Sequence, residues 1–367
     1  MNLNSQIQLI KDIDINSMLE AKRRWDSIAK PLGSLGKLED IIIQIAGMKE
    51  NARTLELDKK ALLIFCADHG VVEEGVTQTS SHVTRVVTDN FSKGITCVNN
   101  MAKVAATDVY PIDIGLFGKR YDTKDLRMGE VIDRRIADGS LNIAKESAMT
   151  RRQCEEAIMV GIELVKELKD KGYGIIGTGE MGIGNTTPTS ALSAVLLNKT
   201  VDEVAGVGAG LSREGFLRKK EVLERIVLRH KKNKLSSPID ILADIGGFEI
   251  AGMVGTFLGG GIHQIPILID GVISAVAALI AVYIEPKVKG YILVSHLSME
   301  PAAKYIYEEL KMEPILHCNM RLGEGSGAIA IMPLIAMGVS IYENMATFDD
   351  IQIESYKDMS EENTGSL

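Results

Sequence analysis

Residues 173–187 read Tyr-Gly-Ile-Ile-Gly-Thr-Gly-Glu-Met-Gly-Ile-Gly-Asn-Thr-Thr. The apolar start of this stretch, residues 173–176, predicts a strand, and the apolar pattern over residues 189–197 predicts a helix that residues 185–187 would cap. Glycine carries no Cβ, so the turn between them lets another molecule approach the backbone closely. A strand, a glycine turn and the N-terminus of a helix together form an anion site. The stretch therefore predicts an α/β unit that binds a phosphate beside the lone carboxylate of Glu180.

Strand-like and helix-like segments alternate on both sides of this stretch. Helical patterns separate the apolar runs, as in residues 151–170, where Thr150 and Gln153 are placed as in a capping box. Continuous apolar strands between helices are typical of a parallel sheet with helices on both faces. We expect strands at residues 61–66, 106–114, 173–176, 265–269 and 291–294.

The two ends of the chain look different from its middle. Residues 10–29 and 35–51 have helical patterns with no strand between them, and residues 328–341 are helical again. The prediction is an α/β Rossmann-like domain over residues 61–330. Residues 1–60 and 331–367 would pack together as a small helical domain.

Composition and charge exclude several classes of protein. Hydrophobic residues make up 46% and charged residues 25% of the chain, as in a globular protein, and the net charge is −8. Proteins whose main partner is nucleic acid usually carry a basic surface, so this negative charge argues against such a partner.

The four cysteines form no CxxC pair, and the N-terminus has no signal-peptide pattern, which favours a cytoplasmic protein with reduced thiols. The apolar run 265–284 contains Asp270, Pro266 and Gly271, so we expect a buried strand and helix rather than a membrane span.

Polar residues follow several of the expected strands. Asp68-His69-Gly70 follows the first strand, Asp113 ends the second, residues 177–180 follow the third and residues 295–298 follow the last. Ligands of doubly wound sheets bind outside the carboxyl ends of the strands. These residues therefore predict a cleft at that edge.

A second carboxylate stands in a glycine loop, as Gly323-Glu324-Gly325. Glutamate is a poor turn former, so this placement favours a base facing a ligand over an exposed loop acid. Desolvation by a bound ring would raise its pKa and strengthen it as a base. Gly206–Gly210 precedes a basic helix in which Lys219 either reaches a phosphate or belongs to a solvated face. The GxGxxG pattern at residues 177–182 also fits a nicotinamide-dependent oxidoreductase, although the expected ribose-binding acid is not evident.

Several strings together resemble the nicotinate-nucleotide–dimethylbenzimidazole phosphoribosyltransferase (CobT) family. They span nearly the whole chain in order: residues 30–39, 68–76, 179–187, 267–271, 321–328 and 345–348. The resemblance implies transfer of phosphoribose from nicotinate mononucleotide to a base, which gives an α-ribotide and nicotinate for cobalamin. It also implies a homodimer that needs no metal or other cofactor.

The resemblance carries roles to individual residues. Glu324 matches the family's general base and Glu180 a second acid. We expect donor contacts from Gly182, Gly184, Asn185, Thr186, Gly208 and Lys219, and acceptor contacts from Asp68, Thr77, Ser80, Arg85 and Leu322.

The chain departs from the family pattern around the acceptor pocket, at residues 80–81, 85, 302–303 and 317–318. A phenolic or purine acceptor, or a non-catalytic subunit paired with a paralogue, therefore stays open. If Arg85 lines the pocket, its positive charge favours a phenolate.

Overall fold

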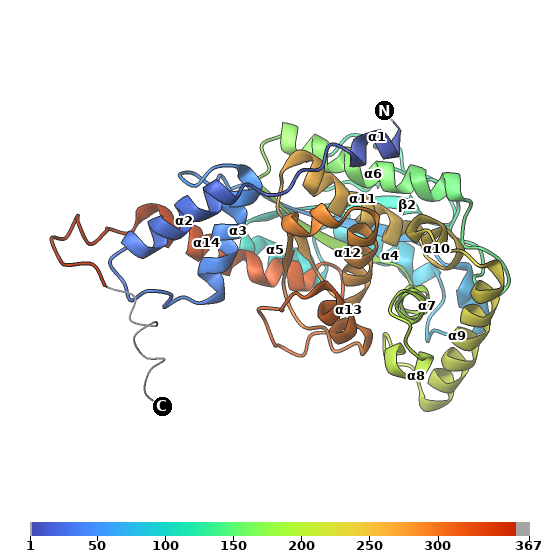
Figure 1. Cartoon of the computed structure of the whole chain (residues 1–367). Helices are drawn as coiled ribbons and strands as arrows, with labels where there is room; N and C mark the ends of the chain where they lie inside the picture. Colours follow the sequence, from blue (N-terminus) through green and yellow to red (C-terminus); the bar gives the residue numbers. More distant parts are fainter. Residues whose placement is uncertain (1, 357–367) are drawn as a thin grey trace, which may run out of the picture.

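The computed structural model describes residues 2–356, and its centre is a six-stranded sheet in which every pair of neighbours is parallel (Figure 1). The strand order is β3-β2-β1-β4-β5-β6. This order reverses direction between β1 and β4, which is the point where doubly wound sheets bind ligands. The strands are β1 (Lys60–Ala67), β2 (Thr107–Gly115), β3 (Ile132–Asp133), β4 (Ile175–Met181), β5 (Ile267–Ile269) and β6 (Ile292–Val294).

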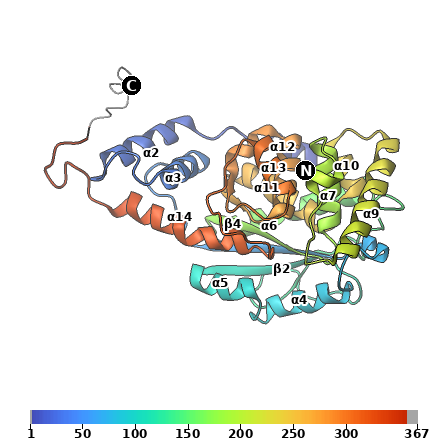
Figure 2. The same cartoon turned by 90° about the horizontal axis from the view of Figure 1, so that it is seen from below.

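Helices cover both faces of the sheet, which explains why most residues of its strands are apolar. On one face α11 and α12 lie against the strands and α6 packs on α11, whereas α4, α5 and α14 pack on the opposite face (Figure 2). The helices are α1 (Leu3–Ile7), α2 (Ile15–Ser27), α3 (Lys37–Lys49), α4 (His82–Ser92), α5 (Cys97–Ala105), α6 (Arg151–Asp170), α7 (Thr186–Leu196), α8 (Val201–Val204), α9 (Arg213–Asn233), α10 (Pro238–Ile245), α11 (Phe248–His263), α12 (Val272–Ile284), α13 (Ala302–Leu310) and α14 (Ser326–Asn344), with short 3₁₀ helices at Gly70–Glu74 and Pro286–Tyr291.

The expected strands and the capped helix are confirmed, with one strand missed. Helix α6 begins at Arg151, and Thr150 and Gln153 form the capping box. Strand β3 has only two residues, which pair with Ile112 and Asp113 of β2. Such a short edge strand has no apolar run to reveal it.

Strand β4 corrects the prediction of a turn after residue 176. It continues to Met181, so Gly177, Gly179 and Glu180 lie within the strand. A Cβ at Gly177 would lie 3.1 Å from the Cβ of Ala328, and one at Gly179 would lie 2.8 Å from the carbonyl oxygen of Glu324. The glycines thus allow α14 and the loop before it to pass close to the sheet. Because they do not form a turn around a pyrophosphate, reading this pattern as a dinucleotide fingerprint is wrong.

Helices from the two ends of the chain lie side by side (Figure 1). The rings of Trp25 and Tyr342 are 5.2 Å apart, and the backbone amide of Ala29 donates to the carbonyl of Ala346. These contacts support our proposal that the terminal segments form a small helical domain. Helix α14 crosses the proposed boundary at residue 330 without a break, so it connects this domain to the sheet. Residues 357–367 of the proposed tail lie outside the described part of the chain.

The apolar run 265–284 is confirmed as a buried strand and helix, β5 and α12. Within residues 2–356, α14 alone is long and apolar enough to cross a membrane, and half of its apolar window is buried inside the protein. A core helix of a globular protein meets the same criteria.

Candidate active site

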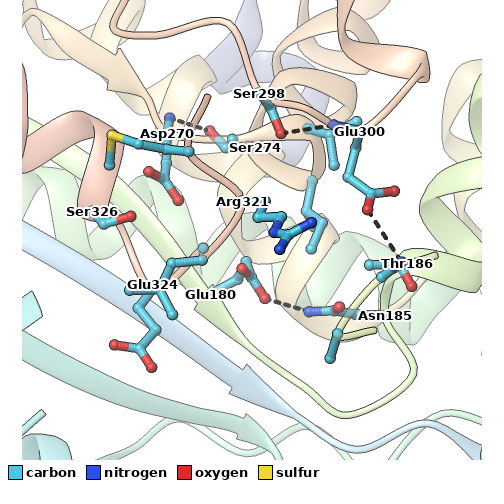
Figure 3. A pocket seen from close by; sticks show the side chains of 18 of the residues that line it. Glu180, Asn185, Thr186, Asp270, Ser274, Ser298, Glu300, Arg321, Glu324 and Ser326 are labelled. Carbon is cyan, nitrogen blue, oxygen red and sulfur yellow. Dashed lines mark hydrogen bonds between the residues drawn. The ribbon is translucent and has the colours of Figure 1, made fainter. Parts of the chain in front are cut away.

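A cavity of about 740 Å³ opens at the carboxyl ends of β4, β5 and β6 (Figure 3). Its wall includes the end of β4 with the following loop, the segments after β5 and β6, the loop 320–326 and the first turns of α5. This confirms the cleft expected from the polar residues after the strands, except that residues 68–70 and Asp113 lie outside the lining. The predicted residues that line it are Glu180, Gly182, Asn185, Thr186, Gly208, Leu322 and Glu324.

Glu324 stands in a left-handed turn on the cavity wall. The φ angles of Gly323, Glu324 and Gly325 are 83°, 62° and 89°, a conformation that glycine adopts freely and glutamate rarely. The backbone amide of Val98, in the first turn of α5, faces the Glu324 carboxylate and tends to lower its pKa. The oxygen Oε2 has no hydrogen-bond partner within residues 2–356. Burial, and then the charge of Asp270, raise the pKa of Glu324, so it is a stronger base than an exposed glutamate.

Glu180 is 7% exposed and lies deeper, at the end of β4. Its carboxyl group accepts a hydrogen bond from the Asn185 side-chain amide, and Gly323 passes so close to its Oε1 that a Cβ there would clash. Burial, with the charges of Asp270 and Glu249, raises the pKa of Glu180 to about 8. Glu180 therefore holds a proton at neutral pH. Figure 3 shows the Glu324 carboxylate pointing away from the Glu180–Asn185 pair, so the two groups face different parts of the cavity.

The expectation that Asn185 caps the following helix is wrong. Asn185 precedes α7 but makes no capping hydrogen bond, because its side chain is hydrogen-bonded to Glu180. The start of α7 still lines the cavity through Thr186.

Lys219 lies behind this helix start rather than on a solvated face. It is fully buried, and its Nζ donates to Thr186 Oγ1 at 2.8 Å and to the carbonyl of Gly206 at 2.9 Å. Burial lowers the pKa of Lys219 to about 8, although the charge of Glu300 opposes the shift. An ammonium group has three N–H donors, so one remains beyond these two bonds.

Gly206 and Gly208 have no side chains, and this allows their loop to pass close to Lys219, Thr186 and Glu300. A Cβ at Gly206 would lie 1.8 Å from Glu300 Oε2, and one at Gly208 would lie 2.9 Å from Thr186 Oγ1. The amide of Gly208 donates to Glu300 Oε1 at 3.1 Å, which ties the loop to the segment after β6.

Two predicted residues lie beside the cavity and not in it. Gly184 and Thr77 line a small hollow of about 70 Å³ that shares the lining residues Gly182, Asn185 and Thr186 with the main cavity. Thr77 Oγ1 donates to the carbonyl of Thr79.

The remaining predicted acceptor residues lie outside the cavity lining of this single chain. Asp68 is buried and accepts from the Phe117 amide at 2.8 Å, while Ser80 is exposed. The Arg85 guanidinium lies 4.6 Å from the centroid of the Tyr121 ring and donates to the carbonyl of Phe117. These contacts hold Arg85 against the loop after β2.

The cavity also contains residues to which no individual role was assigned from the sequence. Cys97 and Met101 line it from α5, Asp270 follows β5, and Arg321 begins the string Arg-Leu-Gly-Glu-Gly. Figure 3 shows the Arg321 side chain inside the cavity beside Glu180. Cys97 and Met101 are one helical turn apart, but no local pattern identifies the helix face that meets Glu324. Within residues 2–356, no cluster of three His, Cys, Asp or Glu side chains is arranged to hold a metal ion.

Known proteins resemble this chain over nearly its whole length. A phosphoribosyltransferase family model matches residues 10–353. A nicotinate-nucleotide–dimethylbenzimidazole phosphoribosyltransferase of Clostridium acetobutylicum is 45% identical, over 97% of this chain and 99% of the relative. One of Acetivibrio thermocellus is 47% identical, over 92% and 93%. The crystal structure of CobT from Thermus thermophilus has a TM-score of 0.86 and 32% identity, and the match covers 93% of this chain and all of that one.

Proposed function

The chain belongs to the nicotinate-nucleotide–dimethylbenzimidazole phosphoribosyltransferase family, and from this premise we propose how its cavity transfers phosphoribose from nicotinate mononucleotide to a benzimidazole base. The reaction belongs to cobalamin biosynthesis. Its products are an α-ribotide and nicotinate.

The donor phosphate binds where the loop after β4 meets α7. Gly182 and Gly208 leave the backbone accessible there, and Thr186 presents a hydroxyl group. Lys219 lies directly behind Thr186 with one donor remaining, and a bound phosphate would favour its protonated form. Asn185 and Glu180 then face the ribose. Because Glu180 is neutral at pH 7, it adds no negative charge to the phosphate side of the cavity.

The acceptor base binds on the other side of the cavity, against Glu324. Cys97, Met101 and Leu322 supply apolar and sulfur-containing walls for a flat ring there. Glu324 takes the proton of the ring N–H, and the freed nitrogen forms a bond to C1′ of the ribose. The bond from C1′ to nicotinate breaks, and its electron pair neutralises the pyridinium nitrogen. Attack from the face opposite nicotinate turns the β-linkage of the donor into an α-linkage.

One observation carries this assignment of roles. The Glu324 carboxylate is held on a glycine loop at the cavity wall, has a raised pKa, and leaves Oε2 without a partner in the described chain. A general base needs this combination of position, basicity and a free acceptor atom.

The test is a product assay with nicotinate mononucleotide and a panel of 5,6-dimethylbenzimidazole, adenine and phenol. We expect nicotinate release to depend on the acceptor, with the benzimidazole preferred, and the product to be the α-ribotide by NMR. Preference for phenol or adenine would reassign the acceptor, and no release with any base would contradict the reaction.

We also propose that the protein is a cytoplasmic homodimer. Its relatives are biosynthetic enzymes, and in this single chain four predicted acceptor residues lie outside the cavity lining. Light scattering of the purified protein at assay concentration should give the mass of two chains. If the active form is instead a heterodimer with a paralogue, the purified chain alone should show little activity.

A further inference from the structure

Asp270 follows β5 directly and is 1% exposed. Its two carboxylate oxygens accept three backbone amides from the segment after Glu324. Oδ2 accepts from Gly325 at 3.0 Å, and Oδ1 accepts from Gly327 at 2.6 Å and from Ala328 at 3.4 Å. Asp270 thus supplies an N-terminal cap to α14 from a distant part of the sequence.

The conformation of this segment needs an external constraint. Three successive residues have left-handed backbone angles, and one of them is Glu324 itself. Such a glutamate is held only where its surroundings determine the backbone. The Glu180 carboxyl group also lies against this loop, because a Cβ at Gly323 would clash with Glu180 Oε1. The loop is therefore held by two buried acidic side chains, Glu180 at the end of β4 and Asp270 directly after β5.

The two acidic side chains do not have the same charge. Two nearby carboxyl groups in a buried site do not both ionise readily, and one keeps a proton. Burial raises the pKa of Asp270, but its two oxygens accept three backbone amides and lie near His296, and these contacts favour the ionised form. Glu180 keeps the proton.

From this arrangement we infer that Asp270 is a positioning residue for the transfer reaction: its carboxylate clamps the left-handed loop so that Glu324 faces the acceptor. The inference rests on the proposed role of Glu324. Asp270 also acts on the charge of that base. Burial is the main cause of the raised pKa of Glu324, and the charge of Asp270 raises it further.

The Asp270→Asn substitution tests the clamp with little change in volume. The asparagine side chain has only one acceptor oxygen. If that oxygen accepts the backbone amides of Gly327 and Ala328, the side-chain NH₂ group faces the backbone N–H of Gly325, and the hydrogen bond to Gly325 is lost. We expect kcat to fall about 10–100-fold, because a displacement of about 1 Å at a catalytic group costs rates of this order. The KM for nicotinate mononucleotide should stay within about threefold, since the Lys219 region is untouched.

The pH profile separates positioning from general damage. The titratable groups facing Asp270 are Glu180 on β4, Glu324 before α14, His296 after β6 and Tyr307 on α13. Loss of the negative charge lowers the pKa of Glu324, so the acidic limb of kcat/KM should move to lower pH. Asp244→Asn is the matched control. Asp244 is also 1% exposed, but it binds Arg229 and His230 away from the cavity. We expect this control to lower Tm while kcat and the acidic limb stay unchanged.

A double-variant cycle decides whether Asp270 acts through Glu324. If it does, Asp270→Asn added to Glu324→Gln should slow the reaction by less than about twofold more. Losses that multiply in the double variant would overturn the inference while leaving Glu324 as the base. An Asp270→Asn enzyme with normal kcat and an unmoved acidic limb would also overturn it. If Glu324→Gln alone turns over at the wild-type rate, the proposed base and this inference are both wrong.

Discussion

Replacing Lys219 by methionine should weaken donor binding through the phosphate alone. Methionine keeps most of the side-chain volume, so the buried space between α7 and α9 stays filled. The change removes the hydrogen bonds to Thr186 and to the Gly206 carbonyl, together with the donor that remains for the phosphate. A charge-assisted hydrogen bond contributes about 1.5–3 kcal/mol, so the Kd for nicotinate mononucleotide should rise roughly 10–150-fold.

The pH dependence gives a second measure of the same contact. Burial lowers the pKa of Lys219 to about 8, so the free enzyme loses the ammonium charge as the pH rises through 8. Donor affinity of the wild type should therefore fall above pH 8, whereas the Lys219→Met variant should not show this dependence. The effect on folding has the opposite sign. Between pH 8 and the ordinary lysine pKa near 10.5 the unfolded chain binds the proton that the folded chain releases, so the Lys219 contribution to stability increases with pH there.

Titration calorimetry with nicotinate mononucleotide and nicotinate riboside, which lacks the phosphate, checks both expectations. The riboside should bind the variant within about threefold of its affinity for the wild type. Equal losses for both ligands would show that Lys219 only shapes the fold around α7. A wild-type affinity for the nucleotide that stays constant from pH 7 to pH 9 would refute the titration of Lys219 in the free enzyme.

Three further substitutions test other parts of the cavity. Glu324→Gln should reduce kcat by roughly 10²–10⁴-fold with donor affinity unchanged, because it removes a positioned base with little change in side-chain volume. Single-turnover rates measure this, and a loss of only a few-fold would exclude Glu324 as the base. Met101→Ala should raise the KM of the benzimidazole about tenfold while the donor KM stays constant, because Met101 lines the acceptor side of the cavity. Steady-state kinetics with each substrate varied in turn measure both constants, and a rise in the donor KM alone would contradict the placement of the acceptor. Arg85→Gln should leave the benzimidazole-to-phenol ratio of kcat/KM within about threefold, because Arg85 packs on Tyr121; a larger shift in a competition assay would place Arg85 at an acceptor site.

Local patterns in the sequence determined most of the secondary structure and the α/β fold class. Thr150 and Gln153 mark the start of α6, and continuous apolar runs mark five of the six strands. These signals depend on neighbours only a few residues apart, so they can be read without knowing the fold. The isolation of Glu324 between two glycines is also local, and it identified the candidate base.

Tertiary structure alone decided what surrounds that base. Asp270 accepts amides from residues more than fifty positions later in the chain, Cys97 and Met101 reach the cavity from α5, and Arg85 turns toward Tyr121. The proton on Glu180 has the same origin, because burial and neighbouring charges raise the pKa of its carboxyl group. Desolvation and contacts between distant segments exist only after the chain has packed, so no local pattern in the sequence encodes them.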